Sequence, residues 1–468
     1  MPEEKITVKG DWWQAHQPDK QLQGHITYGP LSGAEVDLFG DFGNWLDPGH
    51  KPARFTLHGT THDNKPISLF DCLVSGGQSF FPGSAASAVR SLSGIVGGHY
   101  SSLEDVRFQK VSALFTELRD WVWTTGIKTH PGTDDQLVNV TYSLPAIVPL
   151  GQIGPLTVSI HFTATASPGF HTLSIEQDCA LHMEADSMQP HAVFAECISS
   201  FQQFLTLALQ KSAYPTRITG RIDQPREIIA DTPIYDDYLL IHSRSSAKSK
   251  RPACTPHDFL FTSHELDSTP AEAFTRFVHR QKALAASMDL YFTTVHHKFS
   301  LPRVRFLMLA QSLEAYHRAT MPGKYVSDES YNTGLRKLLW DAIPKDPGTT
   351  GKDFLASLGG KMDHLHEFSL RKRLKELTAK HSPILEHLIG PPEAFSTAVA
   401  ERRNQLTHAS EQNEGAGEDY RTLCVLCDKM ALLLEVCFLN EIGFTHDRLK
   451  QIVTTRSDRA RSVHQGWV

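Results

Sequence analysis

The spacing of apolar residues changes along this chain of 468 residues, and the change limits the folds available to it. Up to about residue 180, short alternating runs such as GHITYG, AEVDLFG and LTVSIHFTA are separated by Gly, Pro, Asn and Asp. Such runs predict antiparallel strands in a sandwich or barrel. From Pro190 onward long helical patterns follow, and the C-terminal third is purely helical. The predicted fold class is α+β, with a β-rich, sandwich-like N-terminal domain followed by an all-α bundle.

The change of pattern also gives the expected domain boundaries. We expect a β-rich domain over residues 1–265 and a connector helix over 266–300. A helical domain is expected over 301–455, followed by a tail over 456–468.

Two helical segments carry most of the packing expected in the C-terminal domain. The segment 420–442 is apolar on nearly all sides, so we expect it to be buried, partly against another subunit. The segment 303–319 has one apolar stripe, formed by Phe306, Leu309, Leu313 and Tyr316.

Charge and cysteine content limit the binding partners and the cellular compartment that we expect for the protein. The formal net charge is −6, so the chain as a whole does not attract nucleic acid, and a polyanion would need a local basic patch. Seven scattered cysteines in a chain of this size predict free thiols in a reducing compartment. No signal-peptide pattern is visible, and the longest apolar run, 430–440, is too short to span a bilayer. We expect a cytoplasmic protein without a membrane partner.

No group of side chains has convincing metal-ligand spacing. Cys424 and Cys427 form a CxxC on an apolar helical pattern without a second ligand pair, which favours core packing over zinc binding. The histidines at 296–297, and the pair His364 and His366, lack a third ligand, so solvated or hydrogen-bonded side chains are expected. We predict no metal and no cofactor.

Two features of the N-terminal half leave a binding role open. The basic segment 243–252 would suit RNA, although a solvated loop is the simpler interpretation. Five tryptophans could line a ligand groove, although aromatic residues in a β domain more often form its core. They are Trp12, Trp13, Trp45, Trp121 and Trp123.

The sequence RNQLTH, residues 403–408, is the strongest candidate for a catalytic motif. It lies at the end of a helical pattern that begins at PPEAF and is followed by the loop ASEQNEGAG. Arg403 offers a permanently charged planar group for phosphate oxygens. His408 is suited to general acid–base catalysis, and Asn404, four residues earlier, can orient the imidazole or hold a phosphate.

A second Arg-x4-His match is less informative. Arg459 and His464 have the same spacing, but nothing in the residues around them predicts a packed element, so we attribute this match to chance.

The motif resembles the R-polar-xxx-H signature of HEPN-domain ribonucleases. RVRFLMLAQSLEAYHR resembles the first helix of the ApeA-like branch, and KGDWW, GHITYG, AEVDLFG and ISLFDC resemble its β-rich N-terminal domain. The resemblance implies a HEPN-like helical bundle, a homodimer or higher homo-oligomer, and a metal-independent endoribonuclease that acts on RNA in abortive-infection defence against phage. It further implies that the N-terminal domain senses a phage-derived trigger, and that Glu314 supports Arg403 and His408.

Two alternatives remain open from the residues. Arg402 also fits the looser family spacing, but it shares an apolar stripe with Phe395, Val399 and Leu406, whereas Arg403 is followed by Asn404. The protein could also be a non-catalytic module that binds a nucleotide or partner. Residues five apart diverge by about 140° on a regular helix, so Arg403 and His408 would point apart. Either the helix ends near Thr407 and lets His408 turn toward Arg403, or, as the family resemblance implies, two protomers share the site.

Overall fold

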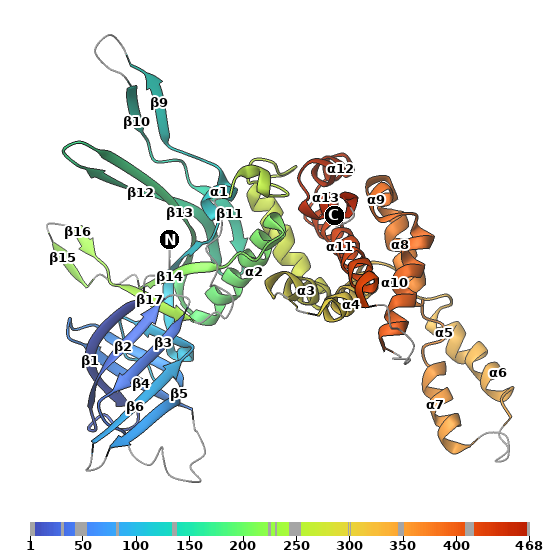
Figure 1. Cartoon of the computed structure of the whole chain (residues 1–468), viewed down its shortest axis with the longest axis horizontal. Coiled ribbons are helices and arrows are strands. Elements are labelled where there is room, and N and C mark those ends of the chain that lie inside the picture. The colour runs from blue at the N-terminus through green and yellow to red at the C-terminus, as the bar shows by residue number, and fades with distance from the viewer. Residues whose placement is uncertain are drawn as a thin grey trace. The chain divides into compact units, whose positions relative to one another are not determined.

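The chain divides into two units, Met1–Val278 and His279–Val468, with the division inside helix α3 (Pro270–His296). The computed structural model (Figure 1) describes residues 5–29, 32–42, 54–80, 84–132, 138–222, 226–229, 232–242, 254–297, 299, 301–344, 351–407 and 416–465.

Six strands close into an antiparallel barrel at the N-terminal end of the first unit. Their order is β5-β4-β1-β2-β3-β6, and pairing between β5 and β6 completes the ring. The inward face carries the alternating apolar residues, including Trp12, Ile26, Val36, Leu57 and Val89, all fully buried. The strands are β1 (Ile6–Gln14), β2 (Leu22–Gly29), β3 (Gly33–Leu38), β4 (Phe55–Thr61), β5 (Pro66–Phe80) and β6 (Ser84–Ser91).

The barrel continues into an open antiparallel sheet. From β5 the order runs β7-β17-β14-β8-β13-β12-β11, and two small hairpins, β9–β10 and β15–β16, stand apart from it. The bounds are β7 (Ser93–Val96), β17 (Asp237–His242), β14 (Pro215–Arg221), β8 (Arg107–Phe115), β13 (Leu173–Pro190), β12 (Leu156–Pro168), β11 (Val148–Ile153), β9 (Ile127–Pro131), β10 (Val138–Tyr142), β15 (Glu227–Ile229) and β16 (Thr232–Ile234). The β-rich N-terminal half is therefore confirmed, with a barrel as its first part.

Helix α2 (His191–Leu209) packs on strands β8 and β13 of this sheet. Phe201 stacks edge-on against Phe115 and against Trp121 of the short helix α1 (Leu118–Val122). By length and composition α2 could cross a membrane, but 61% of its apolar window is buried inside the protein.

The tryptophans divide between core and surface. Trp12 and Trp121 are fully buried, Trp13 is half-buried and Trp123 is exposed. Trp45 and the basic segment 243–252 lie outside the described residues.

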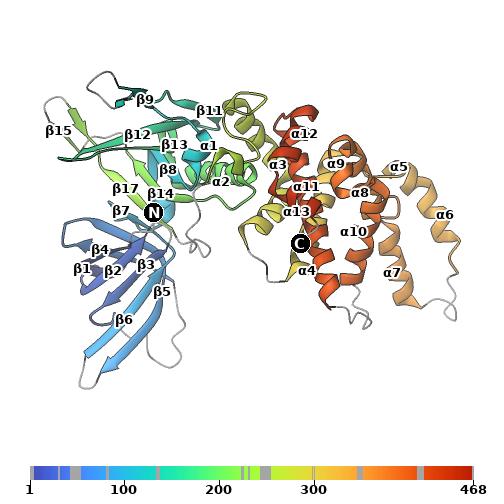
Figure 2. The ribbon, with the colours of Figure 1, turned by 45° about the horizontal axis from the view of Figure 1, so that its top comes forward.

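The second unit is a helical bundle, which confirms the predicted fold class (Figure 2). Helix α11 (Ala416–Glu441) packs against α4 (Pro302–Thr320) and α13 (Asp458–Gln465), and the predicted stripe of α4 is fully buried. The remaining helices are α8 (Leu370–Lys380), α9 (Ser382–Ile389), α10 (Pro392–Thr407) and α12 (His446–Thr455).

A helical arm, defined here as residues 328–362, was only partly predicted. It comprises α5 (Asp328–Ser330), a π-helical turn (Tyr331–Leu335), α6 (Arg336–Asp341) and α7 (Lys352–Met362). The sequence predicts shorter helices around residues 334–342 and 363–388. Helix α7 was therefore not expected, and 363–369 is not helical. The Tyr331 hydroxyl donates to the Met362 carbonyl at 2.6 Å, and this bond ties the two sides of the arm together.

The expectation that 456–468 is an unpacked tail is wrong for the described residues, because they form α13. Arg459 is buried there and its Nε lies 2.5 Å from Oε1 of Glu435, while its Nη1 lies 3.6 Å from Oδ1 of Asp428. Both acids are buried on α11, and the Tyr291 hydroxyl also donates to Glu435 at 2.6 Å. Buried carboxylates need a cation, so the match at Arg459 is structural.

Helix α11 is buried as predicted, and the single chain itself covers most of its apolar side chains. Its side chains from Met430 to Leu439 are buried within the same chain, including Glu435. Cys427 is fully buried as well, and burial raises the pKa of its thiol to about 12, consistent with the predicted core packing.

We predict that Arg459→Ala lowers the free energy of unfolding by about 3–5 kcal/mol, because it leaves the buried carboxylate of Glu435 without its cation, whereas Asp428 keeps Arg305 at 2.8 Å. Urea denaturation followed by circular dichroism measures the change. Arg461→Ala is the matched control on the same helix: its side chain is exposed and pairs with Asp458 at the surface, so a change below about 1 kcal/mol is expected. Equal effects of the two substitutions would contradict the assignment.

Candidate functional site

Two of the residues predicted from the sequence line one open depression in the helical unit. Glu314 comes from α4 and Arg403 from α10, and the depression has a volume of about 630 Å³. Arg318, Tyr325, His364 and Glu367 also line it.

Helix packing brings Glu314 and Arg403 together. Leu313 and His317 on α4 are buried, and this places Glu314 and Arg318, one turn apart, at the border of the packed face. On α10, Val399 is fully buried and Arg403 follows one turn later. Because α4 and α10 pack against each other and against α8, their border residues converge on the same depression.

Arg318 is the centre of the charge network in the depression. Its Nη2 lies 3.0 Å from Oε1 of Glu314, and its Nη1 lies 2.7 Å from Oε2 of Glu367. Hydrogen bonds from Arg318, and then from His364, hold the pKa of Glu367 down at about 2. The Glu367 carboxylate in turn raises the pKa of Arg318.

A second arginine, Arg373, binds the backbone segments that border the depression. Arg373 on α8 is buried, and its Nε donates to the Phe368 carbonyl at 3.0 Å while Nη2 donates to the Gly323 carbonyl at 3.2 Å. Its Nη1 lies 3.1 Å from Nδ1 of His317. A Cβ at Gly323 would come within 2.4 Å of Arg373 Nη1, so a side chain there would displace the guanidinium from its present place.

Sequence reasoning missed this support, although a signal was present. Arg373 stands three residues after Leu370 and four before Leu377, on the apolar stripe of its helix. A cation at such a position needs buried acceptors, which here are backbone carbonyls.

The other predicted residues are not brought into the depression by the described structure. Asn404 is exposed, and its backbone carbonyl accepts from the Thr407 hydroxyl at 3.2 Å. Arg402 is half-buried, donates to Gln405 at 3.0 Å and does not line the depression. His408, the third predicted residue of the motif, lies outside the described residues.

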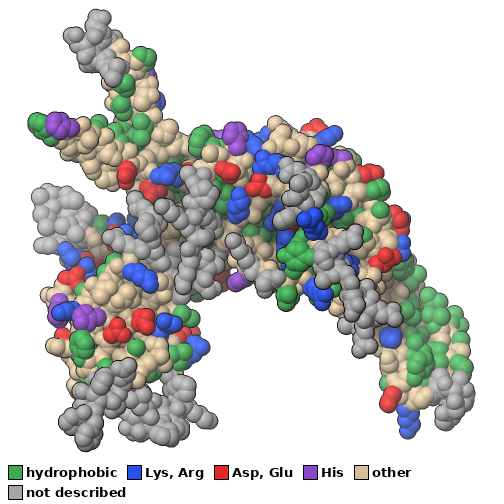
Figure 3. Space-filling view, in the orientation of Figure 1, with side chains coloured by type: hydrophobic (Ala, Val, Ile, Leu, Met, Phe, Trp, Pro, Cys, Tyr) green, Lys and Arg blue, Asp and Glu red, His purple; other side chains and the backbone are tan. Residues whose placement is uncertain are grey.

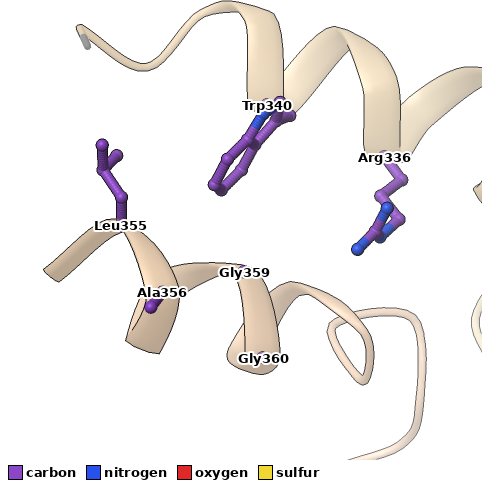
Figure 4. A pocket seen from close by; sticks show the side chains of 6 residues that line it. All are labelled: Arg336, Trp340, Leu355, Ala356, Gly359 and Gly360. Atoms are coloured by element: carbon purple, nitrogen blue, oxygen red, sulfur yellow. The ribbon is translucent and has the colours of Figure 1, made fainter. Parts of the chain in front are cut away.

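A second depression, of about 420 Å³, lies between α6 and α7 (Figure 4). Trp340 and Arg336 from α6 face Leu355, Ala356 and the glycine pair 359–360 of α7. Arg336 is paired with Asp363 at 2.6 Å, and the other lining side chains named here carry no acid or base. This site therefore offers apolar contact, whereas the first depression offers charge and acid–base groups.

No group of three or more His, Cys, Asp or Glu side chains is placed to hold a metal ion within the part of the chain that the structure describes.

Comparison with known families covers most of the sequence. Residues 7–277 match the family model described as ApeA N-terminal domain 1, and residues 307–448 match the one described as Apea-like HEPN. No curated protein and no solved structure matches the chain significantly.

The low pKa of Glu367 predicts a pH-dependent contribution to stability. A carboxylate whose pKa falls from 4.5 to about 2 on folding stabilises the protein fully above pH 4.5. This contribution is lost as the pH falls toward 2. We expect Glu367→Gln to be less stable than wild type at pH 7, with the difference shrinking between pH 4.5 and 2. Urea unfolding across this range measures it; a difference independent of pH would contradict the assignment.

Proposed function

Because this chain belongs to the ApeA-like HEPN family, whose helical domains are generally nucleases, we propose that it is a metal-independent endoribonuclease of antiphage defence. The observation that carries the proposal is the depression that Glu314 and Arg403 share with Arg318. Arg403 places a guanidinium at this open surface, where it can meet an RNA phosphate, while Arg318 is held there by Glu314 and Glu367. A chain of net charge −6 needs such a local site to hold RNA.

The proposed reaction is attack of the ribose 2′-oxygen on the neighbouring phosphorus. Arg403 holds the phosphate oxygens and balances the charge that develops on them. Glu314 keeps Arg318 at the border of the depression through their ion pair. His408 transfers a proton and Asn404 positions it or the phosphate. The P–O5′ bond breaks, leaving a 2′,3′-cyclic phosphate and a 5′-hydroxyl, with Arg403 in the role that a metal ion has in other nucleases.

Of the two arginines left open by the sequence, we assign Arg403 to the phosphate. Arg403 lines the depression, whereas Arg402 contacts Gln405 on its own helix. This supports a flanking role for Arg402.

We propose that the working site is completed by a second copy of the chain. Arg403 and His408 diverge by about 140° if the helix continues, so two protomers facing each other would supply a full set. The arm carries an exposed apolar face over α6 and α7 (Figure 3), formed by Leu335, Leu338, Leu339 and Phe354.

The arm suits a second copy better than a polyanion. Its charged residues have both signs, and Arg336 is already paired with Asp363. The apolar face also leads toward the depression, because exposed Leu365 at the base of the arm lines it. A symmetric dimer would bury this exposed apolar surface, and the surface adjoins the incomplete site.

The setting of the reaction follows from the family. We place the protein in the cytoplasm, with its N-terminal unit sensing a phage-derived trigger and the helical unit cutting RNA in an abortive-infection response.

A non-catalytic binding module is the second candidate, and the ion pairs of Arg318 favour it. Glu314 and Glu367 already neutralise this arginine, so the depression could hold a nucleotide or partner without reacting. Binding without any cleavage of RNA would select this alternative.

Arg403→Ala and His408→Ala should each lower kcat/KM for RNA cleavage on the order of 10²-fold or more, because each removes a group that acts on the reacting phosphate. A fluorogenic RNA assay in EDTA, with circular dichroism to verify folding, measures the loss. Arg402→Ala and Arg461→Ala are the controls and should stay close to wild type. Full activity of either motif variant would refute the site.

Leu338→Asp should shift the protein from dimer to monomer and lower its ribonuclease activity, because it places a charge on the proposed apolar interface. Leu338 is 70% exposed, so the substitution leaves the fold of the single chain intact. Light scattering coupled to size-exclusion chromatography measures the mass. Leu173→Asp is the matched control, since Leu173 is 63% exposed on the β-rich unit. A Leu338→Asp variant that remains dimeric and active would remove the arm from the interface.

A further inference from the structure

We propose that His364, held by Glu367, is a second acid–base residue of the depression and protonates the leaving 5′-oxygen. The inference rests on the proposed ribonuclease function, and it adds a residue outside the RNQLTH motif. Its basis is the juxtaposition of His364, Glu367, Arg318 and Arg403 around one open volume.

The two nitrogens of the His364 ring have different surroundings. Nδ1 lies 2.9 Å from Oε1 of Glu367. Nε2 makes no hydrogen bond with any residue in the described part of the chain, and the side chain is 75% exposed. A carboxylate on one ring nitrogen fixes the proton and the ring orientation there and leaves the other nitrogen for a substrate.

The carboxylate that holds His364 is charged and firmly placed. The two oxygens of Glu367 have different partners. Oε1 accepts from His364, whereas Oε2 accepts from Arg318 and lies 3.6 Å from Nη2 of Arg373. Because Glu367 is ionised at neutral pH, its Oε1 can accept the hydrogen bond of the His364 ring nitrogen Nδ1. Glu367 therefore acts as a positioning residue.

The backbone around the pair is also fixed. The Glu367 amide donates to the His364 carbonyl at 3.0 Å, which closes a tight turn between them. Lys324 forms an isolated antiparallel bridge with Glu367, and Arg373 holds the next carbonyl, that of Phe368. The turn therefore presents His364 from a supported wall of the depression.

His366, two residues later, shows what a structural histidine of this segment looks like. It is buried, its Nε2 lies 2.6 Å from Oδ1 of Asp328, and its ring stacks on Tyr331 with 4.4 Å between centroids. The imidazole ring of His364, by contrast, is exposed in the depression. His366 therefore has a packing role in the arm, whereas His364 is accessible to a substrate.

The reaction has two proton transfers, one from O2′ and one to O5′, and His364 of the depression supplies the second. As O2′ bonds to phosphorus, His408 takes the 2′-hydroxyl proton. As the P–O5′ bond breaks, protonated His364 gives its Nε2 proton to O5′, so the 5′-hydroxyl forms and no other reactant is consumed. Arg403 stays charged throughout.

The test compares His364→Ala with wild type on RNA and on RNA carrying a 5′-bridging phosphorothiolate, whose sulfur leaves without a proton. On ordinary RNA we expect kcat to fall on the order of 10²-fold with little change in KM, and the alkaline limb of the kcat–pH profile to flatten. On the phosphorothiolate the variant should regain a rate within about threefold of wild type. His387→Ala, an exposed histidine on α9 that does not line the depression, is the control and should leave all rates unchanged.

Distinct outcomes separate this inference from the proposed function. Full activity of His364→Ala, with His408→Ala inactive, would overturn the role of His364 and leave the ribonuclease standing. Loss on both substrates by a folded His364→Ala, or by His364→Gln, would overturn the role as general acid. Absence of cleavage by wild type would remove the function and the inference together.

Discussion

The buried guanidinium of Arg373 is the interaction on which the candidate site depends. It joins α8 to two backbone segments through the carbonyls of Phe368 and Gly323, and it lies against His317 on α4. A buried cation is stable only when its donors are satisfied, so this arginine can occupy one arrangement of these segments. The wall that carries His364 and Glu367 is thereby set against the helix that carries Glu314 and Arg318.

The two arginines of the depression differ in whether their charge is already paired. Arg318 is engaged by two carboxylates, whereas Arg403 has a long side chain at the end of α10, just before the part of the chain that contains His408. Such a division suits an enzyme that must hold a phosphate without losing its own architecture, because the ion pairs of Arg318 fix the surface while the guanidinium of Arg403 can bind the phosphate. The same division could also serve a resting state in which Arg318 remains neutralised.

Local patterns predicted a large part of the molecule. The stripe of Phe306 and Leu313, the helix that ends near Arg403 and the strands of the barrel all follow from periodicity, and the order of motifs pointed to the family. The convergence of Glu314 and Arg403 was expected from the family resemblance and not from spacing. Helix α7 escaped prediction because its paired glycines weaken the helical signal. Arg459, Arg373 and His364 escaped for a different reason: their roles depend on partners 24 residues or more away, or on a turn whose shape is set by tertiary contacts.

The central claim is that the chain cuts RNA by attack of the 2′-oxygen, with arginine and histidine in place of a metal ion. The most direct measurement is the chemistry of the ends left by purified wild-type protein acting on a defined RNA in EDTA. The account predicts 2′,3′-cyclic phosphate and 5′-hydroxyl ends at undiminished rate in the chelator, with no cleavage of the same strand carrying 2′-deoxy substitutions. Products with 3′-hydroxyl ends, or a strict requirement for added magnesium, would contradict it.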